Sequence, residues 1–292
     1  MARGTGGMTR IYPIYTLPAP AKLNLFLHIT GRRHDGYHEL ETLFQFLDYG
    51  DELSFQVLAD DVVEVTPELP EVPLESHLVY RAAQLLRPYR KQPQGVRIHV
   101  DKHLPMGGGV GGGSSNAATT LLALNRLWQL GLSTEELADL GLSLGADVPI
   151  FVHGHAALAR GVGEHFTPAF PEQAWYVVVH PGVHVSTAEI FQHPDLPRNT
   201  PPIQGPIENW QSFHNDCENL VCSVYPQVAS ARQWLLNYAP SRLTGTGACV
   251  FASFSTKTAA QQALHALPDS YRGFVARGVN QSPVLSALKQ LP

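Results

Sequence analysis

A run of glycines near residue 110 is the feature that most constrains how this chain folds. Residues 105 to 128 read PMGGGVGGGSSNAATTLLALNRLW, and six of the seven positions 107 to 113 are glycine. Each glycine inside a helix or strand costs about 0.5–1 kcal/mol relative to alanine, so this is no ordinary core element. The alternating stretch GVRIHVDKHL precedes the run, and the N-cap residues SSN follow it and introduce a helix expected from about Ser115 to Leu130. A flexible linker is not normally placed between a strand and a capped helix. The pattern therefore predicts a loop that binds an anion, most simply a phosphate, at a helix N-terminus.

Three common nucleotide-binding loops do not fit this context. The Walker A loop requires a lysine after the glycines, and none follows here. Gly107, Gly109 and Gly112 match G-x-G-x-x-G, but a dinucleotide-binding loop also needs an acidic residue at the end of a second strand, about 20 residues later. The acidic residues at that distance, Glu135 and Glu136, fall in an expected helical capping box. The H-R-D and D-F-G signatures of protein kinases are also absent.

The composition indicates a globular protein of the cytoplasm. The 292 residues are 44% hydrophobic and 15% charged, which suits two domains of ordinary size and does not exclude one large domain. The net charge of -5 counts against a general nucleic-acid binder. The three cysteines form no C-x-x-C pair, which indicates a reducing compartment. There is no run of 18 apolar residues and no secretory signal, and we expect residues 1–15 to be a flexible tail.

The pattern of apolar residues predicts an α+β fold. The leucines of KLNLFLHIT alternate with polar residues, which predicts a strand with one buried face and one polar-rich face. The stretch over 40–58 predicts strands around a turn at Gly50, and ADVPIFVHGHAALA predicts a turn that leads into an apolar strand. Five prolines between Phe191 and Trp210 predict a long surface loop or a poorly ordered segment. A change of pattern near Ala157 to Gly163 marks an expected domain boundary.

Four stretches in order resemble the motifs of one family, the GHMP small-molecule kinases. LPMGGGVGGGSSNAA resembles the family's second motif, P-x-x-x-G-L-[GS]-S-S-A-A in form. APAKLNLFLHITGRRHDGYHEL, LGADVPIFVHGHAALARGVGE and SRLTGTGACVF agree with it, so the resemblance extends from about Pro18 to about Pro283. It implies a two-domain α+β architecture, with a ribosomal S5 domain 2-like N-terminal domain over 16–160 and a GHMP kinase C-terminal domain over 161–292. Both substrates would then bind between the two domains.

The glycine run and Asn116 resemble one branch of this family in particular, whose alcohol substrate carries a cytidine diphosphate. That branch implies ATP- and Mg²⁺-dependent phosphorylation of the 2-hydroxyl of 4-(cytidine 5'-diphospho)-2-C-methyl-D-erythritol, in the non-mevalonate pathway of isoprenoid synthesis. The expected partners are these two small molecules, without nucleic acid or membrane, for a monomer or weak homodimer. No tightly held metal is expected, because the histidine pairs lack a zinc-site pattern.

The resemblance assigns the catalytic roles to Asp147 and Lys22. Asp147, in GADVP, would be the general base, although its residue type alone also suits an Asx turn before Pro149. Lys22, in AKLNL, would orient Asp147 and stabilise the developing alkoxide, although a lone lysine that opens a strand is more often a surface residue. Asn24, on the same face of the strand, would hydrogen-bond the substrate.

The resemblance also implies a binding site for the cytosine base. Tyr37 would stack on the ring and His38 would hydrogen-bond it, with Phe191 as the second stacking aromatic and Thr187 as a polar contact. Without the resemblance, Tyr37 and His38 fit a packed aromatic beside a surface histidine equally well.

For ATP, the resemblance implies that the glycine loop surrounds the phosphates. The residues concerned are Lys102, Pro105, Met106, Gly107, Gly108, Gly109, Val110, Gly111, Gly112, Gly113, Ser114 and Ser115. Lys102 fits a position near the adenine, although it could equally be an exposed lysine at a strand end. His77 departs from an asparagine that the family commonly has near the adenine. TGTGA, from Thr244 to Ala248, resembles the third motif, which supports the substrate phosphates, and alone it also suits a glycine bulge.

Three other functions stay open at this stage. The first is a GHMP kinase for a mevalonate-type or sugar substrate, which would have no use for a cytosine site. The second is an oxidoreductase that uses the G-x-G-x-x-G match to bind NAD. The third is a module that binds nucleotide without catalysis.

Overall fold

The computed structural model describes residues 12–68, 72–205 and 207–292. Within these residues, ten strands form one sheet, whose main path runs β3-β4-β2-β10-β7-β9-β8, while β1 pairs with β2, and β5 pairs with both β2 and β6. The strands are β1 (Ile14–Arg32), β2 (His38–Leu58), β3 (Val63–Thr66), β4 (Gly95–Asp101), β5 (Ala157–Arg160), β6 (His165–Pro168), β7 (Trp175–His180), β8 (Ser241–Leu243), β9 (Val250–Phe254) and β10 (Arg272–Val279). The α-helices are α1 (Leu78–Leu86), α2 (Gly112–Leu127), α3 (Thr134–Leu142), α4 (Val148–His153), α5 (Thr187–Gln192), α6 (Glu218–Val224), α7 (Pro226–Leu235), α8 (Lys257–His265) and α9 (Pro283–Ala287). Short 3₁₀ turns lie at η1 (Leu74–Ser76), η2 (Arg87–Tyr89), η3 (Ile207–Ser212) and η4 (Leu288–Gln290).

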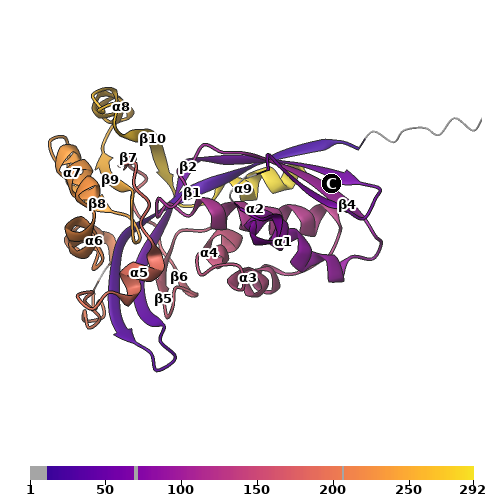
Figure 1. Ribbon diagram of the computed structural model, residues 1–292, viewed down its shortest axis with the longest axis horizontal. Helices are drawn as coiled ribbons and strands as arrows, with labels where there is room; N and C mark the ends of the chain where they lie inside the picture. Colours follow the sequence, from indigo (N-terminus) through magenta and orange to yellow (C-terminus); the bar gives the residue numbers. More distant parts are fainter. Residues whose placement is uncertain (1–11, 69–71, 206) are drawn as a thin grey trace, which may run out of the picture.

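The two long strands β1 and β2 run through the whole molecule and connect its two halves (Figure 1). Positions 19 to 29 of β1 are buried without interruption, so the polar-rich face predicted from the alternation is covered as well as the leucine face. Charged and amide side chains on that face must therefore find partners inside the protein. Lys22 and Asn24, both buried on this face, are bound to each other at 2.6 Å.

The turn predicted at Gly50 is wrong. β2 continues through this residue as a single strand of 21 residues, and Gly50 pairs with Pro20 of β1. A Cβ atom at Gly50 would lie 2.1 Å from the carbonyl oxygen of Ala19. The glycine is required there because the backbones of two strands approach closely. In the sequence alone, a glycine at such a close approach looks the same as a glycine in a turn.

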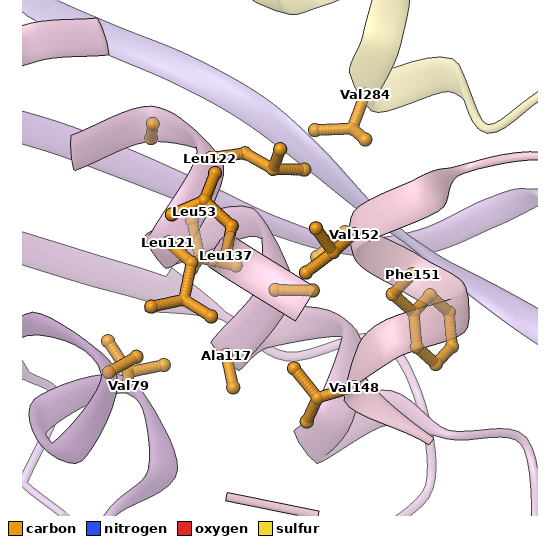
Figure 2. Close-up of a cluster of buried hydrophobic side chains, with 14 of the residues drawn as sticks. Leu53, Val79, Ala117, Leu121, Leu122, Leu137, Val148, Phe151, Val152 and Val284 are labelled. Atoms are coloured by element: carbon orange, nitrogen blue, oxygen red, sulfur yellow. The ribbon is translucent and has the colours of Figure 1, made fainter. Parts of the chain in front are cut away.

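The first half of the molecule has its own hydrophobic core between the sheet and four helices, α1 to α4. The last helix, α9, returns to this core from the far end of the sequence. Figure 2 shows Leu53 of β2, Leu121 and Leu122 of α2, Leu137 of α3, Val148 and Val152 of α4 and Val284 of α9 together in this core. The predicted boundary between residues 160 and 161 stays a prediction.

The second half packs α6, α7 and α8 against β7 and β9, around the valine-rich strand WYVVVH. Leu27 and Ile29 of β1 belong to this second core, whereas Leu23 and Leu25 belong to a third that contains Tyr176. The long strand β1 thus contributes to both halves, which fixes their relative position. None of the helices within the described residues has the length and apolar character required to cross a membrane.

Two helices differ from the sequence-based expectation. Helix α2 starts at Gly112, inside the glycine run, and its N-cap is Gly111 in the left-handed region at φ 77° rather than a residue of the SSN triplet. Residues 148–153 form the helix α4, and the expected apolar strand begins only at Ala157. Pro149 suits the first turn of a helix and Gly154 ends it at φ 69°, but a short apolar run does not separate a helix from a strand. The expected capping box is confirmed at Ser133 and Glu136.

The proline-rich segment forms a surface loop that buried carboxylates hold against the sheet. Asp216 accepts hydrogen bonds from the Thr200 hydroxyl at 2.8 Å and the Ile29 amide at 2.6 Å. Glu41, which is 3% exposed, accepts one from the Ile203 amide at 2.7 Å. The loop therefore has a defined path between α5 and η3 across residues 193–205.

Candidate active site

A buried lysine on β1 is the centre of the candidate site. Lys22 is 2% exposed, and its Nζ atom donates to Oδ1 of Asn24 at 2.6 Å and to the carbonyl of Gly109 at 3.1 Å. The same Nζ lies 3.1 Å from Oδ2 of Asp147. A buried ammonium is stable only when oxygen acceptors surround it, as they do here. The structure thus brings together predicted residues from three segments that lie far apart in the sequence.

Asp147 lies at the N-cap position of α4, but its side chain makes no capping hydrogen bond. Its carboxylate turns instead toward Lys22 and keeps a side-chain exposure of 36%. The alternative interpretation as a simple turn residue before Pro149 therefore gains no support from the described contacts. One oxygen is bound to the ammonium, and the group stays accessible to a small molecule from solvent.

The glycine loop is bound to β1 and to the turn between β8 and β9. The Lys22 amide donates to the carbonyl of Val110 at 3.0 Å, and the Ala248 and Cys249 amides donate to the carbonyls of Gly107 and Gly108 at 3.2 and 3.0 Å. The site therefore forms where the AKLNL strand, the glycine loop and the TGTGA turn meet.

Protein atoms, rather than a ligand, explain four of the glycines. A Cβ atom at Gly107 would lie 2.2 Å from Nδ1 of His184, and one at Gly108 would lie 2.8 Å from Sγ of Cys249. At Gly109 the nearest atom would be the carbonyl oxygen of Thr244, at 2.4 Å, and at Gly111 it would be the Phe151 ring, at 2.7 Å. The expectation that a bound phosphate accounts for the glycines is therefore incomplete. Gly112 and Gly113 have more room, with nearest atoms at 3.4 and 3.3 Å.

The start of α2 offers free hydrogen-bond donors. Its N-cap is a glycine without a side-chain cap, and the amides of positions 112 to 114 have no acceptor among the described residues. The hydroxyl of Ser115 is buried there without a partner in the described part of the chain. Free amides and the helix dipole, equivalent to about half a positive charge, make this end suited to an anion.

Lys102 lies beside this helix end, with Nζ 3.5 Å from the position that a Cβ atom of Gly112 would take. Its ammonium is paired with the fully buried carboxylate of Asp51, which also accepts the amides of His103 and Leu104 at 2.8 Å each. Sequence analysis missed Asp51, whose only signal is an acidic residue inside an apolar strand. Asp51 thus holds the Lys102 ammonium next to the free amides.

His77, the departure from the family pattern, forms the N-cap of α1. Its Nδ1 atom accepts the amide of Val79 at 3.2 Å. Burial, and secondarily the charge of Lys102, lowers the pKa of His77, which favours the neutral ring that this cap requires.

Asn24 connects β1 to the turn that was expected to support phosphates. Its backbone N–H donates to the hydroxyl of Thr244 at 3.0 Å, and its side-chain Nδ2 atom donates to the hydroxyl of Thr42 at 2.8 Å. Because its oxygen accepts from Lys22, the side chain is engaged on both ends. Its predicted substrate contact stays a prediction, and its observed role is to hold the ammonium of Lys22.

Of the residues predicted for the base site, the structure brings His38 and Phe191 together. Their rings lie 5.1 Å apart between centroids and tilt by 34°. The hydroxyl of Thr187 lies 2.8 Å from that of Thr246, which links α5 to the turn of residues 244–248. Tyr37 is 64% exposed, and no contact of its ring with the other two is found in the described part of the chain.

Arg198 is a further residue of this region that sequence analysis missed, because nothing in a proline-rich loop distinguishes it. Its Nε atom donates to Nε2 of His38 at 3.0 Å. Burial lowers the pKa of His38, and the charges of Arg198 and Arg32 lower it further, which favours the neutral ring.

Comparison with known proteins identifies the family. Models of the N-terminal and C-terminal domains of GHMP kinases match residues 77–155 and 206–273. The chain is 57% identical over 279 residues to the 4-diphosphocytidyl-2-C-methyl-D-erythritol kinase of Tolumonas auensis, covering 94% of this chain and 96% of the relative. The chain belongs to the GHMP kinase family. This GHMP kinase is also 54% identical over 289 residues to the enzyme of that name from Hahella chejuensis, covering 94% and 97% of the two chains.

A crystal structure supports the same assignment for this GHMP kinase. The structure of a 4-(cytidine 5'-diphospho)-2C-methyl-D-erythritol kinase matches it with a TM-score of 0.80 and 32% identity, covering 90% of this chain and 98% of the other. The two-domain α+β architecture of small-molecule GHMP kinases, expected from the sequence, is therefore confirmed.

Proposed function

We propose that this small-molecule kinase transfers the γ-phosphoryl group of ATP to the 2-hydroxyl of 4-(cytidine 5'-diphospho)-2-C-methyl-D-erythritol, in the non-mevalonate pathway. Relatives named for this substrate match it along almost its entire length. The observation that carries the proposal is the ion pair of Lys22 and Asp147, 3.1 Å apart, beside the glycine loop.

In this proposal Asp147 accepts the proton of the 2-hydroxyl as the hydroxyl oxygen attacks the γ-phosphorus. The bond between the γ-phosphorus and the oxygen that bridges it to the β-phosphate breaks, and ADP leaves. One carboxylate oxygen is bound to Lys22, and the other has no partner among the described residues, so it is the oxygen that receives the proton. Lys22 holds the carboxylate in one orientation and stabilises the negative charge that develops on the attacking oxygen. Phosphoryl transfer needs little beyond such positioning and charge stabilisation.

The start of α2 is the proposed site for the triphosphate. The free amides of positions 112 to 114 donate to phosphate oxygens, and Lys102 adds a positive charge that Asp51 keeps in place. Mg²⁺ suits an oxygen group at this helix start, because the Ser115 hydroxyl is buried without a partner in the described residues. When bound, the ion would neutralise phosphate charge, held by this oxygen and by ATP itself.

The ring pair of His38 and Phe191 favours the cytidine-bearing alcohol over a mevalonate-type or sugar substrate. These two rings lie 5.1 Å apart, at the start of β2 and on α5, and an alcohol without a base has no use for them. The cytoplasmic location and the state as a monomer or weak homodimer stay predictions.

The topology argues against the oxidoreductase alternative. The glycine loop follows β4, which pairs antiparallel with β2, and after α2 the chain enters α3 rather than a second parallel strand. A dinucleotide-binding loop requires a parallel βαβ unit, so the G-x-G-x-x-G match has no structural support here.

The test is the variant Asp147→Asn, assayed by ADP release with the cytidine-diphospho alcohol. We expect kcat to fall by about 100-fold or more, as for loss of a general base, while the affinity for ATP stays within about twofold. Asp139→Asn, on the exposed face of α3, is the matched control and should keep full activity. Near-normal turnover of Asp147→Asn would exclude this base. Turnover of mevalonate in place of the cytidine substrate would exclude the proposed acceptor, and ATP binding without any turnover would favour the non-catalytic alternative.

A further inference from the structure

Arg198 connects the loop of residues 193–205 to the ring of His38. Its guanidinium donates to the carbonyls of Phe191 at 3.0 Å, His193 at 2.7 Å and Leu196 at 3.0 Å. Its Nε atom donates to Nε2 of His38 at 3.0 Å. Arg198 thus binds two residues of the proposed base site: the backbone carbonyl of Phe191 and the imidazole ring of His38.

The segment that carries Arg198 is itself held on the sheet. Thr200, two residues later, is bound through its hydroxyl to the buried carboxylate of Asp216 and through its amide to the carbonyl of Ile29 at 3.1 Å. The Ile203 amide is bound to Glu41. The backbone that carries Arg198 is therefore held in place, and the guanidinium contacts the His38 ring in one fixed position.

The contact decides which nitrogen of His38 carries the proton. The arginine Nε atom is always a donor, so Nε2 of His38 must accept and cannot carry hydrogen. In the neutral ring, which burial and the neighbouring arginines favour by lowering the pKa of His38, the proton is then on Nδ1. Nδ1 has no partner among the described residues and is the one hydrogen-bonding atom left to the ring.

A histidine fixed in this state distinguishes two pyrimidines. N3 of cytosine has a lone pair and accepts from an N–H donor, whereas N3 of uracil carries hydrogen and would face Nδ1–H donor against donor. A buried donor that has no acceptor costs the complex the free energy of removing that donor from water. This cost corresponds to an affinity for uracil about 10- to 100-fold lower than for cytosine.

We propose that Arg198 is a positioning residue that fixes the Nδ1–H form of His38 and thereby makes this site select cytosine over uracil. The inference rests on the proposed function, in which His38 hydrogen-bonds the base. It assigns a role to the proline-rich loop: the loop keeps the base-reading imidazole in one tautomer.

The first test measures the tautomer in the free enzyme. Nitrogen-15 NMR of histidine-labelled protein separates protonated from unprotonated ring nitrogens, and the spectrum of His38→Asn assigns the signals. We expect hydrogen on Nδ1 of His38 in the wild type and a mixture of both tautomers in Arg198→Met. Hydrogen on Nε2 in the wild type would overturn the inference without any assay of activity.

The second test compares kcat/KM for the cytidine-diphospho alcohol with that for its uridine analogue. We expect the ratio to fall about tenfold or more in Arg198→Met, through KM more than kcat, and to recover in part in Arg198→Lys. Arg32→Met is the matched control, because Arg32 also acts on His38 through its charge but makes no hydrogen bond to the ring among the described contacts. This variant should keep the wild-type ratio.

The outcomes separate a specificity role from a structural role. If Arg198→Met only loosened the loop, KM would rise equally for both substrates and the unchanged ratio would overturn the inference. Equal use of both substrates by the wild type would overturn it as well, and would leave the proposed kinase reaction intact. If the wild type binds CDP over UDP but phosphorylates neither alcohol, the proposed function fails while the inference stands, and equal binding of CDP and UDP overturns the inference.

Discussion

Two alanine substitutions in the glycine loop separate its packing role from its ligand role. At Gly109, a Cβ atom would lie 2.4 Å from the carbonyl oxygen of Thr244 and 2.9 Å from that of Gly247, and the backbone has φ +73°. Both neighbours are backbone atoms, so either the glycine loop or the segment of residues 244–247 must move by about 1 Å to restore ordinary van der Waals contact. At Gly113, the nearest atom is the flexible Cδ1 of Leu78 at 3.3 Å, and the residue is exposed within helix α2.

The two substitutions are expected to change the free energy of unfolding in opposite directions. In Gly109→Ala, the left-handed backbone costs about 1–2 kcal/mol and the overlap about 1–3 kcal/mol, which together lower the free energy of unfolding by about 2–5 kcal/mol. That is a large part of the about 5–15 kcal/mol that stabilises a typical domain. Gly113→Ala replaces a helical glycine and should raise the free energy of unfolding by up to about 1 kcal/mol.

The same two variants test the triphosphate site. If the amides at positions 112 and 113 bind phosphate, a methyl group at Gly113 obstructs that approach while the fold stays intact. The loss of one hydrogen bond to a charged group predicts a KM for ATP about tenfold higher or more. Urea unfolding and steady-state kinetics measure the two effects on the same protein. An unfolding free energy for Gly109→Ala within about 0.5 kcal/mol of the wild type would refute the packing argument. An unchanged KM for ATP in Gly113→Ala would refute the ligand argument.

Two further predictions concern stability alone. Gly50→Ala should lower the free energy of unfolding by about 1–3 kcal/mol, because its Cβ atom would lie 2.1 Å from the carbonyl oxygen of Ala19, whereas Gly31→Ala on β1, with nothing closer than 3.8 Å, should have little effect in the same urea titration. Burial, assisted by the charge of His214, lowers the pKa of His28 below 6.5, so the unfolded chain binds a proton more readily and stability falls as the pH decreases from about 6.5. His28→Phe, which fits among the rings of Phe26 and Phe213, should reduce this loss between pH 7.5 and 5.5, and an unchanged pH dependence of unfolding would show that His28 does not contribute.

The sequence predicted the residues of the candidate site from local motifs together with the family resemblance. Lys22 on an alternating strand, Asp147 before an apolar run and a glycine run before a helix were all recognisable without a structure. Local signals also predicted the capping box of α3, because a capping box is completed within four consecutive residues. The family followed from four such motifs in order, and comparison with known proteins confirms it.

Contacts between distant segments could not be predicted, because no local pattern encodes them. Gly50 resembled a turn residue until its approach to Ala19 was seen, and the glycines of the loop resembled a phosphate cradle until Thr244 and Phe151 were found against them. The buried carboxylates of Asp51 and Asp216 are acidic residues whose partners lie on other elements.

The amino-acid sequence by itself determined what kind of group each motif offers: an ammonium, a carboxylate, free amides and a pair of rings. Only the tertiary structure decided which of these groups meet and in what state. Lys22 is engaged because Asn24, Gly109 and Asp147 converge on it from three segments, and His38 has one tautomer because Arg198 reaches it across 160 residues of chain. The physical reason is that a hydrogen bond or an ion pair depends on distance in space, and the chain sets that distance only when it folds.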